Sequence, residues 1–497
     1  MKSNSIIALS ITIGILLALS LLINNNLSFY GKNGYKSTEY STEINLDNKN
    51  LKISKISGKI HIINNSGWVD FKNDGNCTGS GTYSDPYVIK DLIIDGGGSG
   101  NCITIEYSNV YFKIENNILF NSDVGIKLHH VENGILVDNN CTLNSNGIYS
   151  WDSDNNIILE NAINENSEGI FLSYSNKNII SGNNASYNDI GICCVGTDNN
   201  DNEISVNNAS FNGIGIYIWG GRDNEVSGNT ANNNNNYGIH IFRSRRNQIS
   251  QNTANNNKIH GILVSSNRNM ISDNGGSLWD FHESKGNTIS HNIVNYNEQD
   301  GINLFQSDDN YIWGNIANYN DRDGINLFQS DAYKIWENIA NYNYRNGIHL
   351  SQSNSMTITG NKIKNNSLGI YLESNNKNEI SENTLNYNEI AIILNKSNSN
   401  IIQENIINNN NIGILIYESK CNDISNNSFS NNIEDIQGTQ EKCPLYPHEI
   451  VLTIVIPIVV VAIVIIVIGF FYNKKAMKEG VKEIKFTEGK VKKEIFF

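Results

Sequence analysis

The chain has 497 residues, a formal net charge of −14, 40 Gly and only 4 Pro. This length has room for several globular domains, but the acidic charge argues against nucleic acid as a partner, because nucleic-acid phosphates attract Lys and Arg. The apolar residues are too frequent and too regularly placed for a disordered polar tract. No Pro lies between Asn101 and Lys442, which suits continuous strand pairing because Pro cannot donate to a backbone ladder.

The N-terminal region carries a targeting pattern. Residues Ile6 to Ile23 are almost wholly apolar and follow the basic Lys2. This predicts a secretory signal peptide within residues 1–30, with an uncleaved signal anchor as the alternative. Residues 31–100 are not repetitive, and we expect them to include a cap from Ser57 to Lys90, because the first coil of a repeat array exposes unpaired strand edges.

The central region is an array of repeats. The stretches Asp300–Asn320 and Asp323–Asn343 match at 17 of 21 positions and begin 23 residues apart. They belong to a longer series in which a Gly precedes an apolar residue, usually every 22 to 24 residues. Its members are Gly125, Gly147, Gly169, Gly191, Gly215, Gly238, Gly261, Gly301, Gly324, Gly347, Gly369 and Gly413, with Ala391 filling one gap. Apolar and polar residues alternate after each Gly, which predicts a strand with one face inward.

A second column of the repeat consists of Asn. An Asn followed five residues later by another Asn recurs with the same period, starting at Asn116 and Asn121. Asn tolerates left-handed turn geometry, and its amide can donate to one neighbouring coil and accept from the other. We therefore predict structural ladders of Asn in the turns, around a core of Ile and Leu. The predicted ladder residues include Asn161, Asn166, Asn183, Asn188, Asn315, Asn320, Asn338 and Asn343.

These patterns predict an all-β parallel β-helix, a solenoid of about fifteen coils over residues 101–437, stacked at ~4.8 Å into a rod of roughly 70 Å. A leucine-rich horseshoe has a similar period, but it needs a fixed Leu frame and a helical or extended convex segment, and neither is present. We expect a C-terminal cap from Ile433 to Pro447.

The sequence resembles the right-handed parallel β-helix repeat proteins, specifically the NosD-like surface and periplasmic proteins, over about Ile60 to Gln437. The resemblance rests on the N-x4-N…GI-x-[LI] units and on "GSGTYSDPYVIKDLIIDG" at Gly79–Gly96. It implies a right-handed coil. The wider group includes polysaccharide lyases, glycosidases and epimerases as well as non-catalytic binders, so the fold does not settle the activity. The copper-linked role that the NosD name implies finds little support in 4 Met, 9 scattered His and the vicinal Cys193–Cys194 pair.

The C-terminal region predicts a membrane anchor. Residues 438–449 read as a linker and 450–472 as a transmembrane helix, because the uncharged run from Ile450 to Phe471 can span a bilayer of ~30 Å. The Lys-rich tail 473–497 is then cytoplasmic and the β-helix extracellular, in a protein that crosses the cell membrane once near its C-terminus. Of seven cysteines, Cys421 and Cys443 are a disulfide candidate because they lie one repeat length apart.

The outward positions of the strands suggest a ligand surface. Counted from each Gly, positions +1 and +3 should point inward and positions +2 and +4 outward. Exposed aromatic rings at Tyr217, Trp219, His240 and Phe242 suit sugar rings, although stacked aromatic side chains can equally stabilise neighbouring coils. At position +7 the residues Arg222, Arg245 and Arg268 follow one another, and such a strip could clamp carboxylates or sulfates. The alternative is a solvated turn whose charges are balanced by neighbours.

One interval in the Gly series is 40 residues long, between Gly261 and Gly301. Placing Gly276 in the Gly column leaves one short coil and predicts a notch in the rod at 271–289, beside Trp279. The catalytic candidates there are Asp280, His282, Glu283 and Lys285, which together could support general acid–base chemistry on a sugar. A deletion without function is the alternative. The Asp-rich coils that follow could hold calcium, but no other metal ion or cofactor is expected.

Three hypotheses for the function follow. The first is a membrane-anchored extracellular β-helix that binds a polysaccharide or cell-surface glycan without catalysis. The second is a polysaccharide lyase or glycoside hydrolase acting at the notch. The third is a structural rod or adhesin with a glycosylated surface, since the chain has Asn-x-Ser/Thr sequons such as those at Asn184 and Asn208. The duplicated coil favours binding or scaffolding, because copying a coil lengthens a platform whereas a catalytic site exists once.

Overall fold

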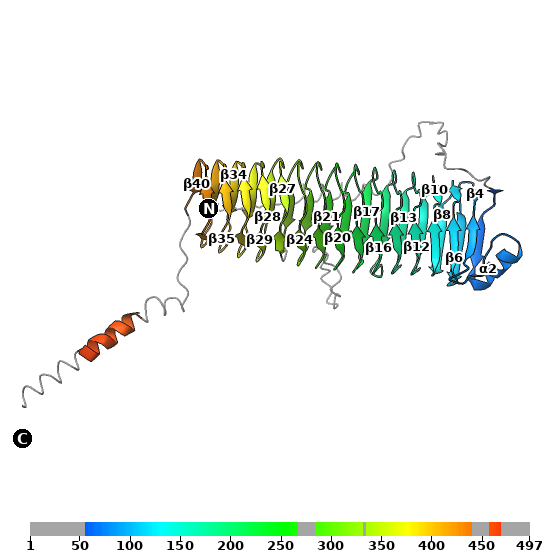
Figure 1. The fold of residues 1–497 in the computed structure, drawn as a ribbon, viewed down its shortest axis with the longest axis horizontal. Helices are drawn as coiled ribbons and strands as arrows, with labels where there is room; N and C mark the ends of the chain where they lie inside the picture. The colour runs from blue at the N-terminus through cyan, green and yellow to red at the C-terminus, as the bar shows by residue number, and fades with distance from the viewer. Residues whose placement is uncertain (1–54, 267–283, 332–333, 440–456, 469–497) are drawn as a thin grey trace, which may run out of the picture. The chain divides into compact units, whose positions relative to one another are not determined.

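The fold is described by a computed structural model, which describes residues 55–266, 284–331, 334–439 and 457–468. The repeats form a right-handed parallel β-solenoid, in which each strand pairs with strands of the preceding and following coils (Figure 1). The predicted fold class is confirmed for the rod.

The 16-stranded sheet forms one side of the solenoid. Its strands are β2 (Ile60–Ile63), β5 (Asn101–Ser108), β8 (Val124–Val131), β11 (Asn146–Trp151), β13 (Glu168–Ser173), β15 (Ile190–Val195), β17 (Ile214–Trp219), β19 (Ile239–Phe242), β21 (Ile262–Ser265), β23 (Ile302–Phe305), β25 (Ile325–Phe328), β28 (Asn346–Ser351), β31 (Leu368–Glu373), β34 (Ile390–Asn395), β37 (Ile412–Tyr417) and β40 (Glu434–Gln437).

The 15-stranded sheet forms the second side. Its strands are β3 (Tyr87–Lys90), β6 (Phe112–Glu115), β9 (Gly134–Val137), β12 (Ile157–Leu159), β14 (Ile179–Ser181), β16 (Glu203–Ser205), β18 (Glu225–Ser227), β20 (Gln248–Ser250), β22 (Thr288–Ser290), β24 (Tyr311–Trp313), β26 (Lys334–Trp336), β29 (Thr357–Thr359), β32 (Glu379–Ser381), β35 (Ile401–Gln403) and β38 (Asp423–Ser425).

Two short sheets form the third side, one at each end of the rod. The first contains β1 (Lys55–Ile56), β4 (Leu92–Asp95), β7 (Ile118–Phe120) and β10 (Asn140–Thr142), and the second contains β27 (Ile339–Asn341), β30 (Lys362–Lys364), β33 (Thr384–Asn386), β36 (Ile406–Asn408) and β39 (Ser428–Ser430). In the coils between them, isolated parallel bridges such as Asn184↔Asn208 continue the third side.

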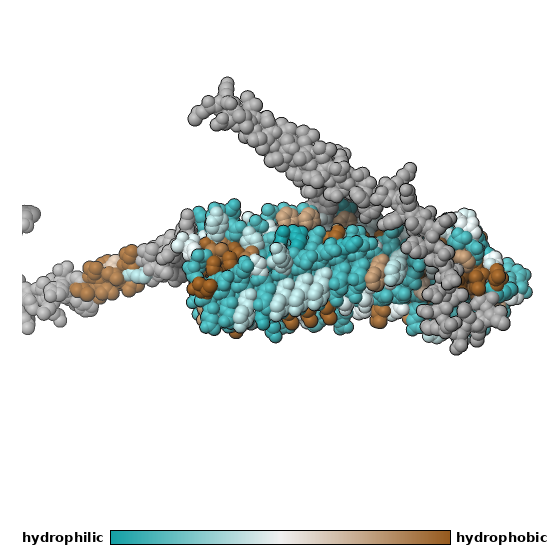
Figure 2. Space-filling model, turned by 90° about the horizontal axis from the view of Figure 1, so that it is seen from above, coloured by the Kyte–Doolittle hydropathy of each residue, from teal (hydrophilic) through white to brown (hydrophobic). Residues whose placement is uncertain are grey.

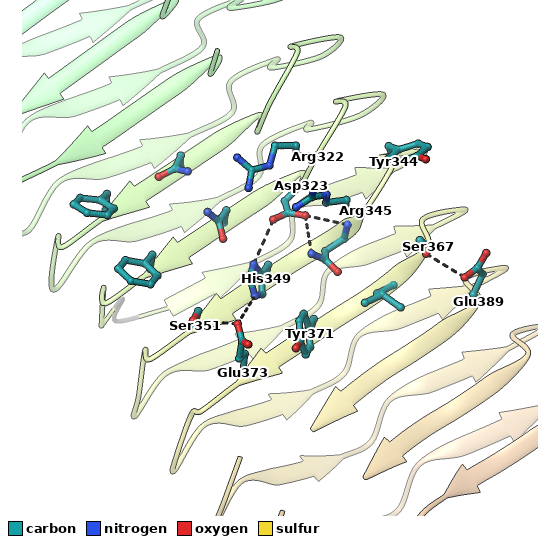
Figure 3. A pocket seen from close by; sticks show the side chains of 16 residues that line it. Arg322, Asp323, Tyr344, Arg345, His349, Ser351, Ser367, Tyr371, Glu373 and Glu389 are labelled. Carbon is teal, nitrogen blue, oxygen red and sulfur yellow. Dashed lines mark hydrogen bonds and ion pairs between the residues drawn. The ribbon is translucent and has the colours of Figure 1, made fainter. Parts of the chain in front are cut away.

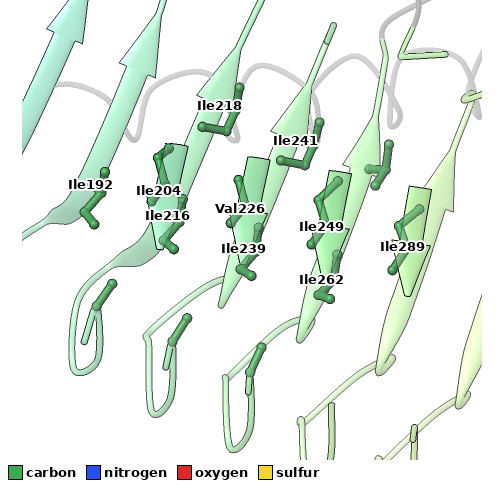
Figure 4. Packing of buried hydrophobic residues seen from close by; sticks show 14 of the residues in the cluster. Ile192, Ile204, Ile216, Ile218, Val226, Ile239, Ile241, Ile249, Ile262 and Ile289 are labelled. Atoms are coloured by element: carbon green, nitrogen blue, oxygen red, sulfur yellow. The ribbon is translucent and has the colours of Figure 1, made fainter. Parts of the chain in front are cut away.

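The repeat period sets the register of the coils. Ile302 pairs with Ile325, so each residue of the duplicated stretch lies beside its own copy in the next coil. The same register stacks Ile and Leu side chains into continuous columns inside the rod, as Figure 4 shows for Ile216, Ile239 and Ile262. Fully burying one such side chain contributes about 1.5–3 kcal/mol, so the period that aligns the columns also builds the core.

Two columns of Asn side chains run through the turns as hydrogen-bonded ladders. The Asn161 side-chain amide donates to Asn183 Oδ1 at 2.9 Å, and the Asn161 backbone N–H donates to the same oxygen at 2.9 Å. The second column repeats this arrangement, since the Asn320 amide donates to Asn343 Oδ1 at 3.0 Å. All these side chains are buried, so the ladders satisfy backbone and side-chain groups that burial would otherwise leave without partners.

The left-handed residue of each turn is the one before the ladder Asn. Glu160 and Glu165 have φ of 54° and 58°, and they precede Asn161 and Asn166. The expectation that the ladder residues themselves adopt left-handed geometry is wrong. In the first pair, Asn116 and Asn121 are the left-handed residues, and the ladder positions there are held by Asn117 and Ser122.

A third Asn ladder, which was not predicted, lies in the turn between the 16-stranded and 15-stranded sheets. There the Asn178 amide donates to Asn202 Oδ1 at 3.2 Å and the Asn202 amide donates to Asn224 Oδ1 at 3.1 Å. Met356 replaces Asn at one position of this column and is also buried.

The Gly column reflects a close approach between coils. A Cβ atom added to Gly301 would lie 2.7 Å from the carbonyl oxygen of Gly324 and 2.8 Å from the side-chain nitrogen of Asn320. Real Cβ atoms do not come this near to backbone, so a side chain here would push the coils apart.

The 40-residue interval is a single coil, because β20 pairs directly with β22 and β21 pairs directly with β23. The prediction of a short coil and a notch at 271–289 is therefore wrong. The extra residues fall between β21 and β22, where they leave the strand hydrogen bonds intact. Asp280, His282, Glu283 and Trp279 lie outside the described residues.

The same register corrects the predicted basic strip. Arg245 is bridged to Arg222 on one side and to Lys285 on the other. Lys285, and not Arg268, therefore takes the third position of this column, and Arg268 lies outside the described residues. The Lys285 ammonium lies 2.9 Å from Asp309 Oδ2.

The helix α2 (Asn64–Asn73) covers the N-terminal end of the rod (Figure 1). It buries Trp68, whose indole nitrogen donates to Ser108 Oγ at 3.1 Å. At the other end, β40 is the last strand of the 16-stranded sheet. The rod face in Figure 2 is mainly hydrophilic, with apolar patches toward both ends.

Two predictions concern segments that are described only in part. Cys421 is disulfide-bonded, but Cys443 lies outside the described residues, so this pairing stays a prediction. Of the predicted membrane span 450–472, residues 457–468 are described and are helical. Within the described ranges, no helix combines the length and the apolar character that crossing a membrane requires. The predicted signal peptide at 1–30 lies outside the described residues.

Candidate functional site

A groove of about 900 Å³ lies on the outer face of the 16-stranded sheet. We call it the sheet groove. It is built by the duplicated coils and the two coils that follow them, so it crosses β23, β25, β28 and β31 (Figure 3). Its lining residues are Asn303, Phe305, Arg322, Asp323, Asn326, Phe328, Tyr344, Arg345, Asn346, His349, Ser351, Ser367, Leu368, Tyr371, Glu373 and Glu389.

Two buried carboxylates mark the start of this groove. Asp300 and Asp323 are equivalent residues of the duplicated stretch and precede the Gly of their coils. The Asp323 backbone N–H donates to Asp300 Oδ1 at 3.1 Å, and the Asn303 amide donates to Asp300 Oδ2 at 2.6 Å. Asp323 Oδ1 in turn accepts the Asn346 amide at 2.7 Å.

Burial and mutual repulsion act on this carboxylate pair. Burial, and then the charge of Asp323, raise the pKa of Asp300 to about 6. Burial also lowers the pKa of the neighbouring His260 to about 4, helped by the charge of Arg322. At neutral pH the pair therefore carries negative charge while His260 is neutral.

His349 joins the carboxylates to the next coils. Its Nδ1 lies 3.4 Å from Asp323 Oδ2, and its Nε2 lies 3.8 Å from Glu373 Oε2. Figure 3 shows the imidazole between these two carboxylates. The Tyr371 ring stacks on it, with centroids 4.9 Å apart and planes at 7°. The arrangement fixes the imidazole in the wall of the groove.

Several buried polar atoms in the groove have no hydrogen-bond partner. They are Arg322 Nε, Asn326 Oδ1, Asn346 Oδ1 and His349 Nε2. A buried polar atom without a partner costs about 1–3 kcal/mol, and most such atoms in proteins are satisfied. All four belong to residues that line the sheet groove.

The aromatic side chains of the groove present edges more than faces. Phe305 and Phe328 stack along the rod with centroids 5.4 Å apart and planes at 12°. Stacked rings cover each other's faces, so this geometry favours the alternative that outward aromatic residues stabilise neighbouring coils.

The aromatic residues predicted to bind ligand lie together, outside the sheet groove. Tyr217 and Trp219 are in β17, and His240 and Phe242 are in β19. The rings pack on one another, with 5.1 Å between the centroids of Tyr217 and His240 and 5.7 Å between those of His240 and Phe242. Trp219 is 40% exposed, whereas burial lowers the pKa of His240 to about 3. This patch stays a prediction.

Sequence reasoning found only part of the groove. Phe305, Phe328, His349 and Tyr371 occupy outward positions of the predicted strands. For Asp300 and Asp323 the sequence suggested only a candidate calcium site. Arg322 and Arg345 were missed because they lie two residues before the Gly column, a position that the repeat pattern leaves unrestricted. The sequence feature that could have pointed to the groove is the Asp-Gly dipeptide, which occurs in both copies of the duplicated stretch.

The comparison with protein families matches this fold. The model of the family described as "Periplasmic copper-binding protein (NosD)" matches residues 22–208 and 275–442, which together make up more than half of the chain. The chain belongs to the NosD family. The model of the right-handed beta helix region matches residues 196–275 of this NosD-family chain. No curated protein is similar enough to count as a relative.

Several solved structures are similar to this NosD-family protein. The A-module of a mannuronan C-5 epimerase from Azotobacter vinelandii is 13% identical, with 77% of this chain and 100% of that chain covered and a TM-score of 0.36. A family 28 exopolygalacturonase of Yersinia enterocolitica is 9% identical, with coverages of 68% and 72% and a TM-score of 0.33. A tailspike protein of E. coli bacteriophage HK620, in complex with a pentasaccharide, is 12% identical, with coverages of 74% and 74% and a TM-score of 0.37. These likenesses concern the fold alone and carry no functional argument.

Proposed function

We propose that the chain is a carbohydrate-binding solenoid that holds an extended glycan in the sheet groove. The observation that carries this proposal is the set of four buried polar atoms without partners, supplied by two successive coils. Sugar hydroxyl groups both donate and accept hydrogen bonds, so a glycan can pair with the polar side chains that line the groove, such as those of Arg322 and Asn326. A polymer also repeats its hydroxyl groups, as the coils repeat their side chains every ~4.8 Å.

The family description names copper, but the described residues do not fit a copper site. They include no group of three or more His, Cys, Asp or Glu side chains that could hold a metal ion. The soft candidates Cys193 and Cys194 are buried, and burial raises the pKa of Cys194 to about 12. Metals bind the thiolate, so these thiols are poor ligands.

We propose that the rod is displayed outside the cell by a C-terminal anchor. Support comes from the uncharged run Ile450 to Phe471 and from the Lys-rich tail that follows it. Protease added to intact cells should remove the rod and leave a tag at the C-terminus protected. A C-terminal tag that is digested together with the rod would contradict this topology.

A catalytic role is the alternative. Of the predicted catalytic residues, Lys285 pairs with Asp309, and the short coil from which the notch was predicted does not form, because β20 pairs with β22. An assay for new chain ends, on whichever glycan the protein binds, separates binding from cleavage.

The binding test uses a glycan array, the full-length protein and a variant that fills the groove. Ser351 follows Phe328 in register, so Ser351→Phe should extend the stack of Phe305 and Phe328 into the groove without disturbing the coil. We expect binding at least tenfold weaker than wild type. The matched control is Ser173→Phe, which lies at the equivalent position next to Trp151 and far from the groove.

The two variants separate the outcomes. If the wild type binds no glycan, the carbohydrate proposal is overturned. If the wild type binds and Ser351→Phe binds equally well, the groove is not the site. A Trp219→Ala variant then tests the patch of Tyr217, Trp219, Arg222, His240, Phe242 and Arg245, since the sequence predicts that patch as the binding site.

A further inference from the structure

We propose that the glycan in the sheet groove is acidic, and that Arg322 and Arg345 jointly bind its carboxylate or sulfate groups. This inference rests on the proposed function, because it names the chemical class of the same ligand. It makes these two residues the determinants of specificity in the groove.

The two arginines occupy the same position on successive coils. The Arg345 backbone N–H donates to the Arg322 carbonyl oxygen at 3.0 Å, and both side chains line the groove. Figure 3 shows both beside Asp323. Coils are stacked at ~4.8 Å, so the two positive charges are supplied by adjacent coils and a bound anion would reduce the repulsion between them.

Within the described part of the chain, neither guanidinium has a carboxylate within ion-pair distance. Arg322 Nη1 donates to the side-chain oxygen of Gln299 at 3.2 Å, which holds the guanidinium in place. Its Nε is buried and has no hydrogen-bond partner. A guanidinium presents its N–H groups as a planar fork that fits the two oxygens of a carboxylate or sulfate. Arg322 is therefore held in position at the groove, and among the described residues its charge has no ion-pair partner.

The nearby carboxylates accept hydrogen bonds from neutral donors and, in the ranges that the structure describes, make no ion pair with either arginine. Asp323 Oδ1 accepts from both the amide and the backbone N–H of Asn346, at 2.7 and 3.1 Å. Asp300 accepts from Asn303 and from the Asp323 backbone. Their negative charge also repels an anion from the inner part of the groove. An acidic group is thus directed to the arginines, while the hydroxyl groups of the sugar can face the Asn and His side chains.

The opposing explanation is that Arg322 and Arg345 only balance the charges of Asp300 and Asp323. The two explanations differ in what a neutral replacement does. A purely structural pair would change stability and leave ligand preference unaltered. A ligand-binding pair would change the preference between acidic and neutral glycans.

The test measures dissociation constants of the full-length protein for three oligosaccharides of equal length, one neutral, one containing uronate residues and one sulfated. We expect the wild type to bind at least one acidic probe tenfold or more tightly than the neutral probe, and this difference to shrink as salt is added. Arg322→Gln and Arg345→Gln should each remove most of the preference while neutral binding changes less than threefold. Lys362→Gln removes one exposed positive charge outside the groove and should leave the preference intact.

The outcomes are distinguishable. Preference for the uronate or for the sulfated probe identifies which acidic group the arginines bind. If the wild type binds neutral and acidic probes equally, or if both Arg variants keep the preference, this inference is overturned while the proposed function stands. If no probe binds, the proposed function fails as well. Thermal melting of each variant shows whether a lost preference reflects unfolding. Arg345→Lys keeps the positive charge but loses the planar guanidinium, so it should keep part of the preference that Arg345→Gln loses.

Discussion

The Asn ladders give a quantitative prediction at Asn315. This side chain is fully buried. Its amide donates to the carbonyl oxygen of Ile289 at 2.9 Å and to Asn338 Oδ1 at 3.0 Å. Its oxygen accepts from the backbone N–H and the side-chain amide of Asn292 at 2.9 and 3.0 Å. Asn315→Ala removes all four contacts.

The cost can be worked out from the groups that lose a partner. In Asn315→Ala the Asn292 backbone N–H stays buried without its acceptor, and the Ile289 carbonyl, which belongs to the ladder between β22 and β24, loses the side-chain donor. At about 1–3 kcal/mol for the N–H without a partner and about 0.5–1.5 kcal/mol for the hydrogen bond that the carbonyl loses, the free energy of unfolding should fall by roughly 1.5–4.5 kcal/mol. In Asn315→Asp the oxygen still accepts from Asn292, but a second oxygen faces two acceptors. The buried carboxyl should then have a raised pKa, and the loss should grow as pH rises above about 4.

The assay combines urea unfolding with hydrogen exchange measured on peptides that cover residues 289–340, because a repeat array can open locally. Asn318→Ala is the matched control: the side-chain oxygen of Asn318 accepts from the Asn341 backbone at 2.7 Å, but this residue is only half-buried. We expect the control to cost under about 1 kcal/mol, since water can replace the lost bond. Equal stability of Asn315→Ala and Asn318→Ala would refute the reasoning that the buried ladder stabilises the rod.

Three further predictions concern other parts of the rod. Burial, and then the charge of Asp323, raise the pKa of Asp300 from 3.8 to about 6. Between these values the folded protein keeps a proton on Asp300 that the unfolded chain releases. The free energy of unfolding should therefore fall as pH rises from about 4 to about 6. Asp300→Asn should therefore raise the free energy of unfolding by up to about 3 kcal/mol at pH 8 and by little at pH 4; an equal effect at both pH values in urea titrations would contradict this. Gly301→Ala should destabilise the rod by about 1–3 kcal/mol, because its Cβ would meet the Gly324 carbonyl. Gly58→Ala, which has open space around it, should be neutral in the same thermal melts. Deleting the 17 residues 267–283 should leave a coil of 23 residues, the spacing of the duplicated stretch. We expect an unchanged melting temperature, because Ser284 Oγ already donates to the Ser265 carbonyl at 2.7 Å. A large drop in the melting temperature would argue against the single-coil register.

The period of the sequence was enough to predict the coil and its core. Gly and Ile recur at fixed intervals, and a parallel solenoid is the arrangement in which such residues stack on themselves. Periodicity failed where the chain departs from it. In the 40-residue interval the Gly at 276 suggested a second coil, but only hydrogen bonding shows which strands pair, and β20 pairs with β22.

The groove depended on contacts that a repeat pattern does not contain. Arg322 and Arg345 occupy a position where other coils carry unrelated residues, so nothing in the period marks them. Burial of Asp300 and Asp323 results from the packing of Asn303, Asn346 and His349 around them. The repeat pattern predicts that Phe305 and Phe328 point outward. It does not predict that one ring covers the next, because that depends on the register between the coils.

The Asn ladders give the rod an electrical direction. In both columns the side-chain oxygen accepts from the preceding coil, as Asn183 does from Asn161 in one column and Asn343 does from Asn320 in the other. The carbonyl dipoles therefore add along the axis, as peptide dipoles add in a helix, with the negative end at the N-terminal side. At the C-terminal end of one column, the Asn432 amide donates to the carboxylate of Asp435 at 3.0 Å, so an anion sits at the positive end. Two such rods meeting end to end would attract when pointing the same way and repel when opposed.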